Sequence, residues 1–154
     1  MASAEELAGF ALLSRLTRGQ RELVARLARQ VTFGRGTTIF SEGQAAAGCW
    51  LIHEGRVALE TVVPGRGPVV VQTLGPGDVL GWSWLVPPHR WQFTARASEQ
   101  VAAAELNTAR LRELAETDPA LGYPLALGLM DAVAARLQAT RSRAMDLYGS
   151  PRGH

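Results

Sequence analysis

The sequence has no lysine, a single cysteine and no long run of apolar residues. Its 16 basic residues are therefore all arginines, and with 14 acids they leave a net charge of only +2. The high isoelectric point reflects arginine chemistry and does not indicate a basic patch. Nucleic-acid binding needs a clustered positive footprint, and none is visible along the chain. We therefore expect no direct nucleic-acid binding.

The scarcity of cysteine and of apolar runs also indicates in which cellular compartment the protein is expected. The lone Cys49 excludes an internal disulfide framework and a cysteine-based zinc site, and it suits a reducing cytoplasm. The N-terminal residues MASAEELAGF carry acids where a signal peptide carries positive charge, and no run of about eighteen apolar residues occurs. We expect a soluble, cytoplasmic protein without membrane association. With 154 residues and 47% hydrophobic content, a single domain over residues 1–154 is expected.

Residues that carry metal or nucleophilic chemistry are few and scattered. A metal site needs at least three convergent ligands, and the three histidines, His53, His89 and His154, offer no close pair. Cys49 and His53 lie about 13 Å apart on one face of a predicted strand, which disfavours a haem site. The chain has no Ser-His-Asp or Cys-His nucleophile motif, P-loop or dinucleotide fingerprint. The sequence predicts a protein that is not an enzyme and that holds no metal.

The first part of the chain, residues 1–30, has the pattern of two short helices. Thr17 and Gln20 match a capping box, in which the two side chains bind the free backbone amides of a first helical turn. Apolar residues then follow at helical spacing and are expected to face a core: Leu23, Val24 and Leu27.

The central part, residues 31–107, changes to short apolar runs bounded by Gly and Pro turns. Such a pattern is typical of an antiparallel sandwich or barrel. The predicted strands are Val31–Phe33, Thr38–Phe40, Cys49–His53, Arg56–Val63, Val69–Leu74, Trp91–Ala97 and Val101–Leu106.

The last part, residues 108–148, is helical again. Asn107 or Thr108 is expected to cap a helix that ends near Glu116. Pro119 is expected to start a second helix, because proline loses nothing at the first helical position, and this helix is expected to reach about Leu147. Residues at spacings of three and four form its predicted seam: Leu125, Leu129, Val133, Leu137, Thr140, Ala144 and Leu147.

Three stretches, in this order, carry a resemblance to a known family. Residues 36–43 read GTTIFSEG, residues 50–57 read WLIHEGRV and residues 74–81 read LGPGDVLG. Together they resemble the cyclic nucleotide-binding domain of Crp/Fnr regulators, protein kinase A regulatory subunits and nucleotide-gated channels. Residues 135–140 look like the dimerisation helix of the bacterial cAMP receptor protein. The resemblance implies an α+β fold: an antiparallel β-roll, jelly-roll-like, with N-terminal helices and a long C-terminal helix.

The resemblance places a phosphate-binding cassette at Gly81, and the chain departs from the family there. In the family a short helix starts at this Gly, a Glu directly after it takes the ribose hydroxyl, and a later Arg pairs with the cyclic phosphate. Here Trp82 stands at the Glu position and Trp91 at the Arg position. Arg90, one residue earlier, is expected to point out of the pocket unless the loop at 86–89 shifts the register. The amides of the expected helix remain available to a phosphate or carboxylate.

The charge pattern agrees with that departure. Between Arg66 and Arg90 the only formal charge is Asp78, and the next carboxylate is Glu99, so no nearby acid replaces the missing Glu. The ligand residues implied by the cassette are Gly81, Trp82, Ser83, Trp84, Leu85, Arg90, Trp91 and Gln92.

Three tryptophans near the cassette leave two interpretations open. Trp82, Trp84 and Trp91 either build an aromatic, nearly uncharged pocket for another ligand or fill the old cavity and turn it into core. On the last helix the resemblance places Thr140 at the purine and Arg136 towards the cassette. The alternatives are a helix–helix seam for Thr140 and a salt bridge for Arg136.

The resemblance implies a non-catalytic, stand-alone regulatory module that senses a small anionic ligand, such as a cyclic nucleotide, through its cassette. Signalling would pass through the last helix, and a homodimer would form through residues 119–147. The alternative is a ligand-free interaction module whose pocket is filled by tryptophan. Crp/Fnr regulators continue into a helix-turn-helix where this chain ends, at residues 149–154, so direct DNA binding is not expected.

Overall fold

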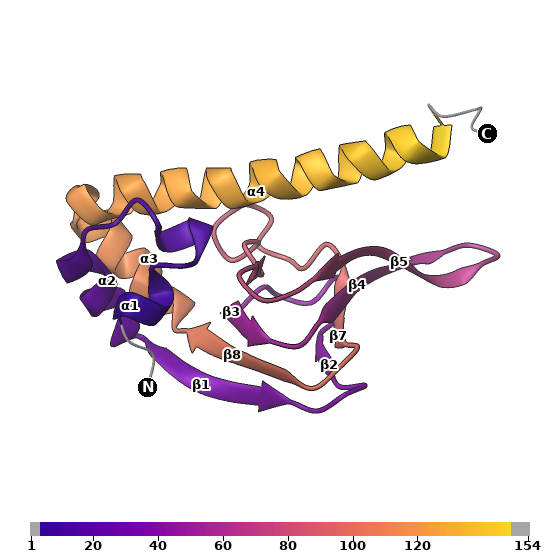
Figure 1. Ribbon diagram of the computed structural model, residues 1–154, viewed down its shortest axis with the longest axis horizontal. Helices are drawn as coiled ribbons and strands as arrows, with labels where there is room; N and C mark the ends of the chain where they lie inside the picture. The colour runs from indigo at the N-terminus through magenta and orange to yellow at the C-terminus, as the bar shows by residue number, and fades with distance from the viewer. Residues whose placement is uncertain (1–3, 149–154) are drawn as a thin grey trace.

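The computed structural model describes the backbone of residues 4–148 and the side chains of residues 5–142 (Figure 1). Three short helices come first: α1 (Ala4–Leu7), the 3-10 helix η1 (Ala11–Leu13) and α2 (Arg18–Ala25). Two helices come last: α3 (Thr108–Thr117) and α4 (Pro119–Tyr148). The strands between them are β1 (Ala28–Phe33), β2 (Thr38–Phe40), β3 (Cys49–Glu54), β4 (Val57–Val63), β5 (Gly67–Leu74), β6 (Val79–Leu80), β7 (Thr94–Ala97) and β8 (Val101–Leu106).

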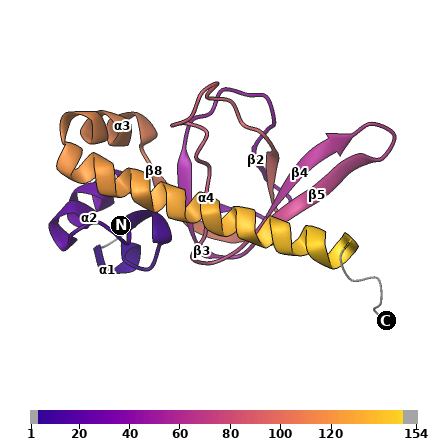
Figure 2. The same cartoon turned by 90° about the horizontal axis from the view of Figure 1, so that it is seen from above.

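The strands form two antiparallel sheets of four. One has the order β1-β8-β3-β6 and the other the order β2-β7-β4-β5. The β4–β5 hairpin extends away from the rest of the roll (Figure 2). This arrangement of an antiparallel roll between N-terminal helices and a long C-terminal helix confirms the predicted α+β fold.

The helix signals in the sequence are confirmed, with one boundary moved. The hydroxyl of Thr17 accepts from the Gln20 amide at 3.2 Å, and the Gln20 side chain accepts from the Thr17 amide at 2.9 Å. The side chain of Asn107 caps α3 in the same way, accepting from the Arg110 amide at 3.2 Å. The roll begins at Ala28 rather than at residue 31, because β1 pairs along its whole length with β8.

The buried side chains form two separate clusters. The helical core joins side chains of the N-terminal helices, α3 and α4 to residues of β3, β6 and β8, and the roll core joins residues of both sheets. The helical core is mainly aliphatic, whereas the roll core contains stacked aromatic rings. The helical core includes Leu7, Leu12, Leu13, Val24, Cys49, Trp84, Leu111, Leu121, Leu125 and Leu129; the roll core includes Phe40, Trp50, Ile52, Leu59, Leu80, Trp91 and Val101.

The first half of α4 is docked tightly on the N-terminal helices. A Cβ atom at Gly128 would lie 2.0 Å from the carbonyl oxygen of Leu12, so only glycine allows this approach to η1. Arg15 and Asp131 add an ion pair of 2.7 Å. Leu125 and Leu129, expected on a dimer seam, are instead buried in the helical core.

The second half of α4 runs out past the helical core (Figure 1). By length and composition, Pro119–Ser142 would be apolar enough to cross a membrane, with a window of 18 residues that has a mean hydropathy of 1.2 and is 22% buried. The apolar residues of α4 lie on two faces of the helix: one face packs in the helical core, and the other is exposed. Large side chains on the exposed face are Tyr123, Met130 and Leu137. The side chains of Ala144 and Leu147 lie outside the described residues.

Candidate functional site

The cassette segment after β6 is not a helix. Residues 83–88 form turns, and the Leu85 amide donates to the Trp82 carbonyl at 3.0 Å. The prediction of a short helix starting at Gly81 is therefore wrong. Two successive prolines, Pro87 and Pro88, lack amide hydrogens and disfavour a helical residue before them, which prevents a helical ladder. Without that helix, the cassette also lacks the helix N-terminus whose dipole was expected to attract an anion.

Gly81 is required by the packing of the cassette. Its φ angle is +93°, a conformation that favours glycine. A Cβ atom there would lie 2.9 Å from the ring of Trp91, so the backbone passes directly beside the indole. Gly81, the glycine of the family motif, thus leaves room for the Trp91 ring beside the backbone.

The three tryptophans have separate locations. Trp91 is 4% exposed and stacks on Phe40 in the roll core, with ring centroids 3.8 Å apart and planes at 12°. Trp84 is buried in the helical core and donates from Nε1 to the Gly81 carbonyl at 3.1 Å. Trp82 is half-buried and packs against the helical core. Two of the three indoles are therefore buried core residues, one in each of the two clusters.

Arg136 connects α4 to the cassette. Its guanidinium carbon lies 4.0 Å from the centre of the Trp82 ring, and its Nη2 donates to the Val79 carbonyl in β6. Burial lowers the pKa of Arg136 to about 10, while the nearby Asp78 charge opposes that shift. The side chain stays cationic at neutral pH, so a charge on α4 is held against the roll by an aromatic face and a carbonyl.

A small cavity remains between the cassette and the roll core. Its volume is about 90 Å³, and Arg136 is the one charged residue among those that line it in the described part of the chain. Ligand pockets usually have about 300 Å³ or more, and each water takes roughly 30 Å³, so this space suits about three waters. The lining residues are Phe40, Leu59, Leu80, Gly81, Trp82, Ser83, Trp91, Gln92, Phe93 and Arg136.

Four of the predicted site residues do not line this cavity. Trp84 and Leu85 pack against the helical core. Arg90 is exposed and donates from Nη1 to the Gly43 carbonyl at 2.9 Å, so the loop does not bring it into the pocket. Thr140 is exposed, and its hydroxyl donates to the Arg136 carbonyl at 3.0 Å.

Among the described residues that line the cavity, none carries a carboxylate. Asp78 uses its Oδ2 to accept from the Gly75 amide at 2.8 Å, which closes the turn before β6. Cys49 is fully buried nearby in the helical core, and burial raises the pKa of its thiol to about 12. It therefore behaves as a small apolar residue and not as a nucleophile.

Four lining residues were missed in the sequence: Phe40, Leu59, Leu80 and Phe93. The strand pattern marks Phe40 and Leu59 as buried, but it does not show that β2, β7 and β4 become neighbours. Only that pairing brings the two side chains to the cassette.

Comparison with known proteins agrees with the fold and the motifs. Residues 30–118 match the family described as cyclic nucleotide-binding domain. The HTH-type transcriptional regulator Cmr of Mycobacterium tuberculosis is 31% identical over 119 residues, which cover 77% of this chain and 47% of that protein. The chain thus spans about half the length of this relative.

Solved structures show the same fold. A putative cyclic nucleotide-binding protein from Geobacter metallireducens is 34% identical with a TM-score of 0.80, covering 89% of this chain and 99% of that one. The regulatory domain of Toxoplasma gondii PKA, crystallised with cAMP, is 20% identical with a TM-score of 0.72, covering 85% of this chain and 48% of that one. The second likeness concerns the fold alone.

Proposed function

Because the chain belongs to the cyclic nucleotide-binding domain family, we propose that it is a non-catalytic regulatory module that acts through α4. In this proposal residues 1–154 work as one unit, and the cassette does not take a cyclic nucleotide in the manner of the family.

The observation that supports this proposal is the small size of the cavity at the cassette. Trp91 stacks on Phe40, and Arg136 seats on Trp82, which leaves a cavity of about 90 Å³. At the positions where the family has an acid for the ribose and an arginine for the phosphate, this chain has Trp82 and Trp91, and Arg90 lies outside the cavity. The roll would then serve as a fixed platform for α4.

Calorimetry with cAMP and cGMP at millimolar concentration tests this proposal. We expect no saturable heat from the wild-type protein. The Trp82→Glu variant restores the family's acid but leaves Arg90 outside, so we expect it to gain no tight cAMP affinity either. Saturable binding of either nucleotide by the wild type, or micromolar binding by this single variant, would contradict the proposal.

A second candidate function keeps the cassette as a sensor for a smaller anion. It is favoured by Arg136, whose cationic guanidinium lines the small cavity. Such a ligand would compete with the Val79 carbonyl and the Trp82 ring for this side chain, and so would shift α4. Mass spectrometry of the native protein distinguishes the two candidates: a co-purified anion that Arg136→Met abolishes supports the sensor, and its absence supports the filled cassette.

The surface through which α4 would act is its exposed face. Tyr123, Met130 and Leu137 are 69%, 65% and 68% exposed and follow one another at intervals of seven residues. A seven-residue apolar repeat is typical of a helix that packs along a second helix. We propose that this face, and not the buried Leu125 and Leu129, forms the seam of a homodimer.

Light scattering tests the homodimer. Met130→Asp and Leu137→Asp put a charge into the proposed seam and are expected to give a monomeric mass. Gln138→Asp, one position further along the same helix, is a matched control that should leave the dimer intact. An unchanged mass in both seam variants, or a monomeric wild type, would contradict the seam.

We further propose that the module works in a reducing cytoplasm and through protein contacts. The lone Cys49 is buried and carries no disulfide, which suits that compartment. We propose no direct nucleic-acid contact by this chain. A mobility-shift assay with duplex DNA tests the last point, with no shift as the expected result.

A further inference from the structure

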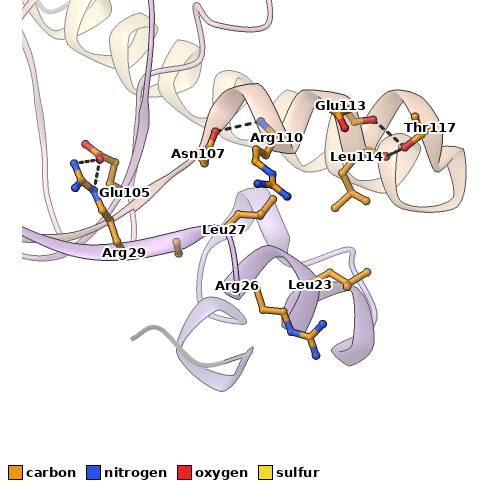
Figure 3. Close-up of a pocket in the computed structure, with 11 residues that line it drawn as sticks. Leu23, Arg26, Leu27, Arg29, Glu105, Asn107, Arg110, Glu113, Leu114 and Thr117 are labelled. Carbon is orange, nitrogen blue, oxygen red and sulfur yellow. Dashed lines mark hydrogen bonds and ion pairs between the residues drawn. The ribbon is translucent and has the colours of Figure 1, made fainter.

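A wide groove lies where α2, the start of β1 and α3 meet (Figure 3). Its volume is about 840 Å³, and it shares no residue with the small cavity at the cassette. We call it the α2–α3 groove. Its lining residues are Leu23, Arg26, Leu27, Ala28, Arg29, Glu105, Asn107, Arg110, Glu113, Leu114 and Thr117.

The floor of the α2–α3 groove is aliphatic. Leu27 and Leu114 pack against the helical core from above, and Leu114 points from α3 towards α2 in Figure 3. Leu23 was expected to face the core, but it is 38% exposed. Leu23 on α2, Leu27 in the turn after it and Leu114 on α3 thus give the groove an apolar surface for a further apolar group.

The rim of the α2–α3 groove carries three arginines and two glutamates, which gives it a net charge of +1. Arg29 is paired with Glu105 at 2.7 Å, and the Glu105 carboxylate also accepts from Trp50 Nε1 at 2.8 Å. Within residues 5–142, no ion pair joins Arg26 or Arg110 to an acid, although both side chains are exposed. The fold therefore brings Arg26 and Arg110 to one groove, and neither of them forms an ion pair within the described residues.

We propose that the α2–α3 groove binds an acidic peptide segment of a partner protein, one that carries aliphatic side chains between its carboxylates. The aliphatic groups would rest on Leu23 and Leu114, and the carboxylates would meet Arg26 and Arg110. Glu105 and Glu113 also line the groove, which makes it unsuited to a continuous phosphate backbone. This inference is independent of what the cassette binds.

The test is selection of peptides on the immobilised full-length protein from a phage-displayed library of random sequences. We expect the selected peptides to be rich in Asp and Glu next to Leu, Ile or Phe. A synthetic copy of the selected peptide should shift the backbone amide resonances of α2 and α3 and not those of the cassette.

Substitutions locate the peptide more sharply. The double variant Arg26→Glu/Arg110→Glu should weaken binding at least about tenfold. Arg112→Glu makes the same charge change on α3 but lies outside the groove, where Arg112 pairs with Glu116 at 3.3 Å, and should leave binding unchanged. Leu23→Ser, at a partly exposed position, should weaken binding without changing the charge. Circular dichroism spectra and thermal melting verify that each variant is folded.

Several results would overturn the proposal. These are a selection that yields no acidic consensus, resonance shifts elsewhere in the protein, or equal losses in the double variant and in Arg112→Glu. Binding of single-stranded DNA or inorganic phosphate to the groove, with the selected peptide inactive, would also overturn it.

Discussion

The two halves of α4 are held in different ways, and the difference shows which half has fewer contacts with the rest of the molecule. The first half lies on η1 and α3, with Leu121, Leu125 and Leu129 buried and Gly128 against the backbone of η1. From residue 134 on, the described side chains of the second half are exposed except for Arg136. The first half is part of the core, whereas the second half depends on one side chain seated on Trp82.

The largest effect is expected where the docked half touches backbone. Gly128→Val would force a side chain against the Leu12 carbonyl, which cannot move without shifting η1, and should lower the free energy of unfolding by at least about 2 kcal/mol. Urea denaturation measures this loss. Gly19→Ala is the control, because nothing lies within 4 Å of a Cβ there and alanine favours a helix. A fully stable Gly128→Val protein would mean that the first half is not tightly docked.

A smaller effect is expected at the contact of the second half. Arg136→Ala removes the contact with the Trp82 ring and a hydrogen bond to β6, and we expect a loss of about 1–2 kcal/mol. The same denaturation experiment on Arg141→Ala, an exposed position on the same helix, should show almost no loss. Equal stability of the two variants would show that Arg136 does not hold the second half.

The reactivity of the Cys49 thiol reports on the first half of α4, because Cys49 is buried in the same core as Leu125 and Leu129. Since burial raises the pKa of Cys49 to about 12, native protein should react only very slowly with a thiol reagent at neutral pH. We expect that protection to persist in Arg136→Ala and to fall in Gly128→Val. Fast labelling of Arg136→Ala would mean that the two halves open together.

The smallest effect is expected at the exposed ion pair of the docked half. Arg15 lowers the pKa of Asp131, so the pair contributes above the ordinary carboxyl pKa of 3.8 and is lost as pH falls through the lowered folded value. Asp131→Asn should therefore be slightly less stable than wild type at neutral pH, and the difference should vanish in acid. Urea unfolding across this pH range measures it, and a difference that persists in acid would rule out the ion pair as its cause.

The sequence predicted the fold better than the site, for a physical reason. Caps such as Thr17 and Asn107 are local, and the turn glycines and apolar runs mark strands whatever their partners. The cavity depends on long-range contacts: the strand predicted from Trp91 begins only at Thr94, and Trp91 in the preceding loop meets Phe40 because β2 pairs with β7. Arg136 was expected towards the cassette from a resemblance, while its seat on the Trp82 ring follows only from the packing of α4.

Two tryptophans of the cassette also show that a local sequence pattern does not predict long-range contacts. Trp82 and Trp84 are two positions apart, yet one contacts Arg136 and the other lies in the helical core. In a regular strand they would share a face, and in a helix they would be about 200° apart, but in a turn no periodicity applies. The groove arginines were missed for a related reason, because Arg26 and Arg110 are far apart in the sequence and only the fold brings them to one groove.

The most direct test of the account is hydrogen exchange along the second half of α4 in a double-variant cycle of Trp82 and Arg136. Trp82→Leu removes the aromatic face, and Arg136→Ala removes the cation. If the roll holds the second half of α4 through this contact, each variant should speed exchange there and leave the first half unchanged, and the double variant should exchange no faster than Arg136→Ala alone. Additive effects of the two substitutions, or exchange that stays as slow as in the wild type, would contradict the account.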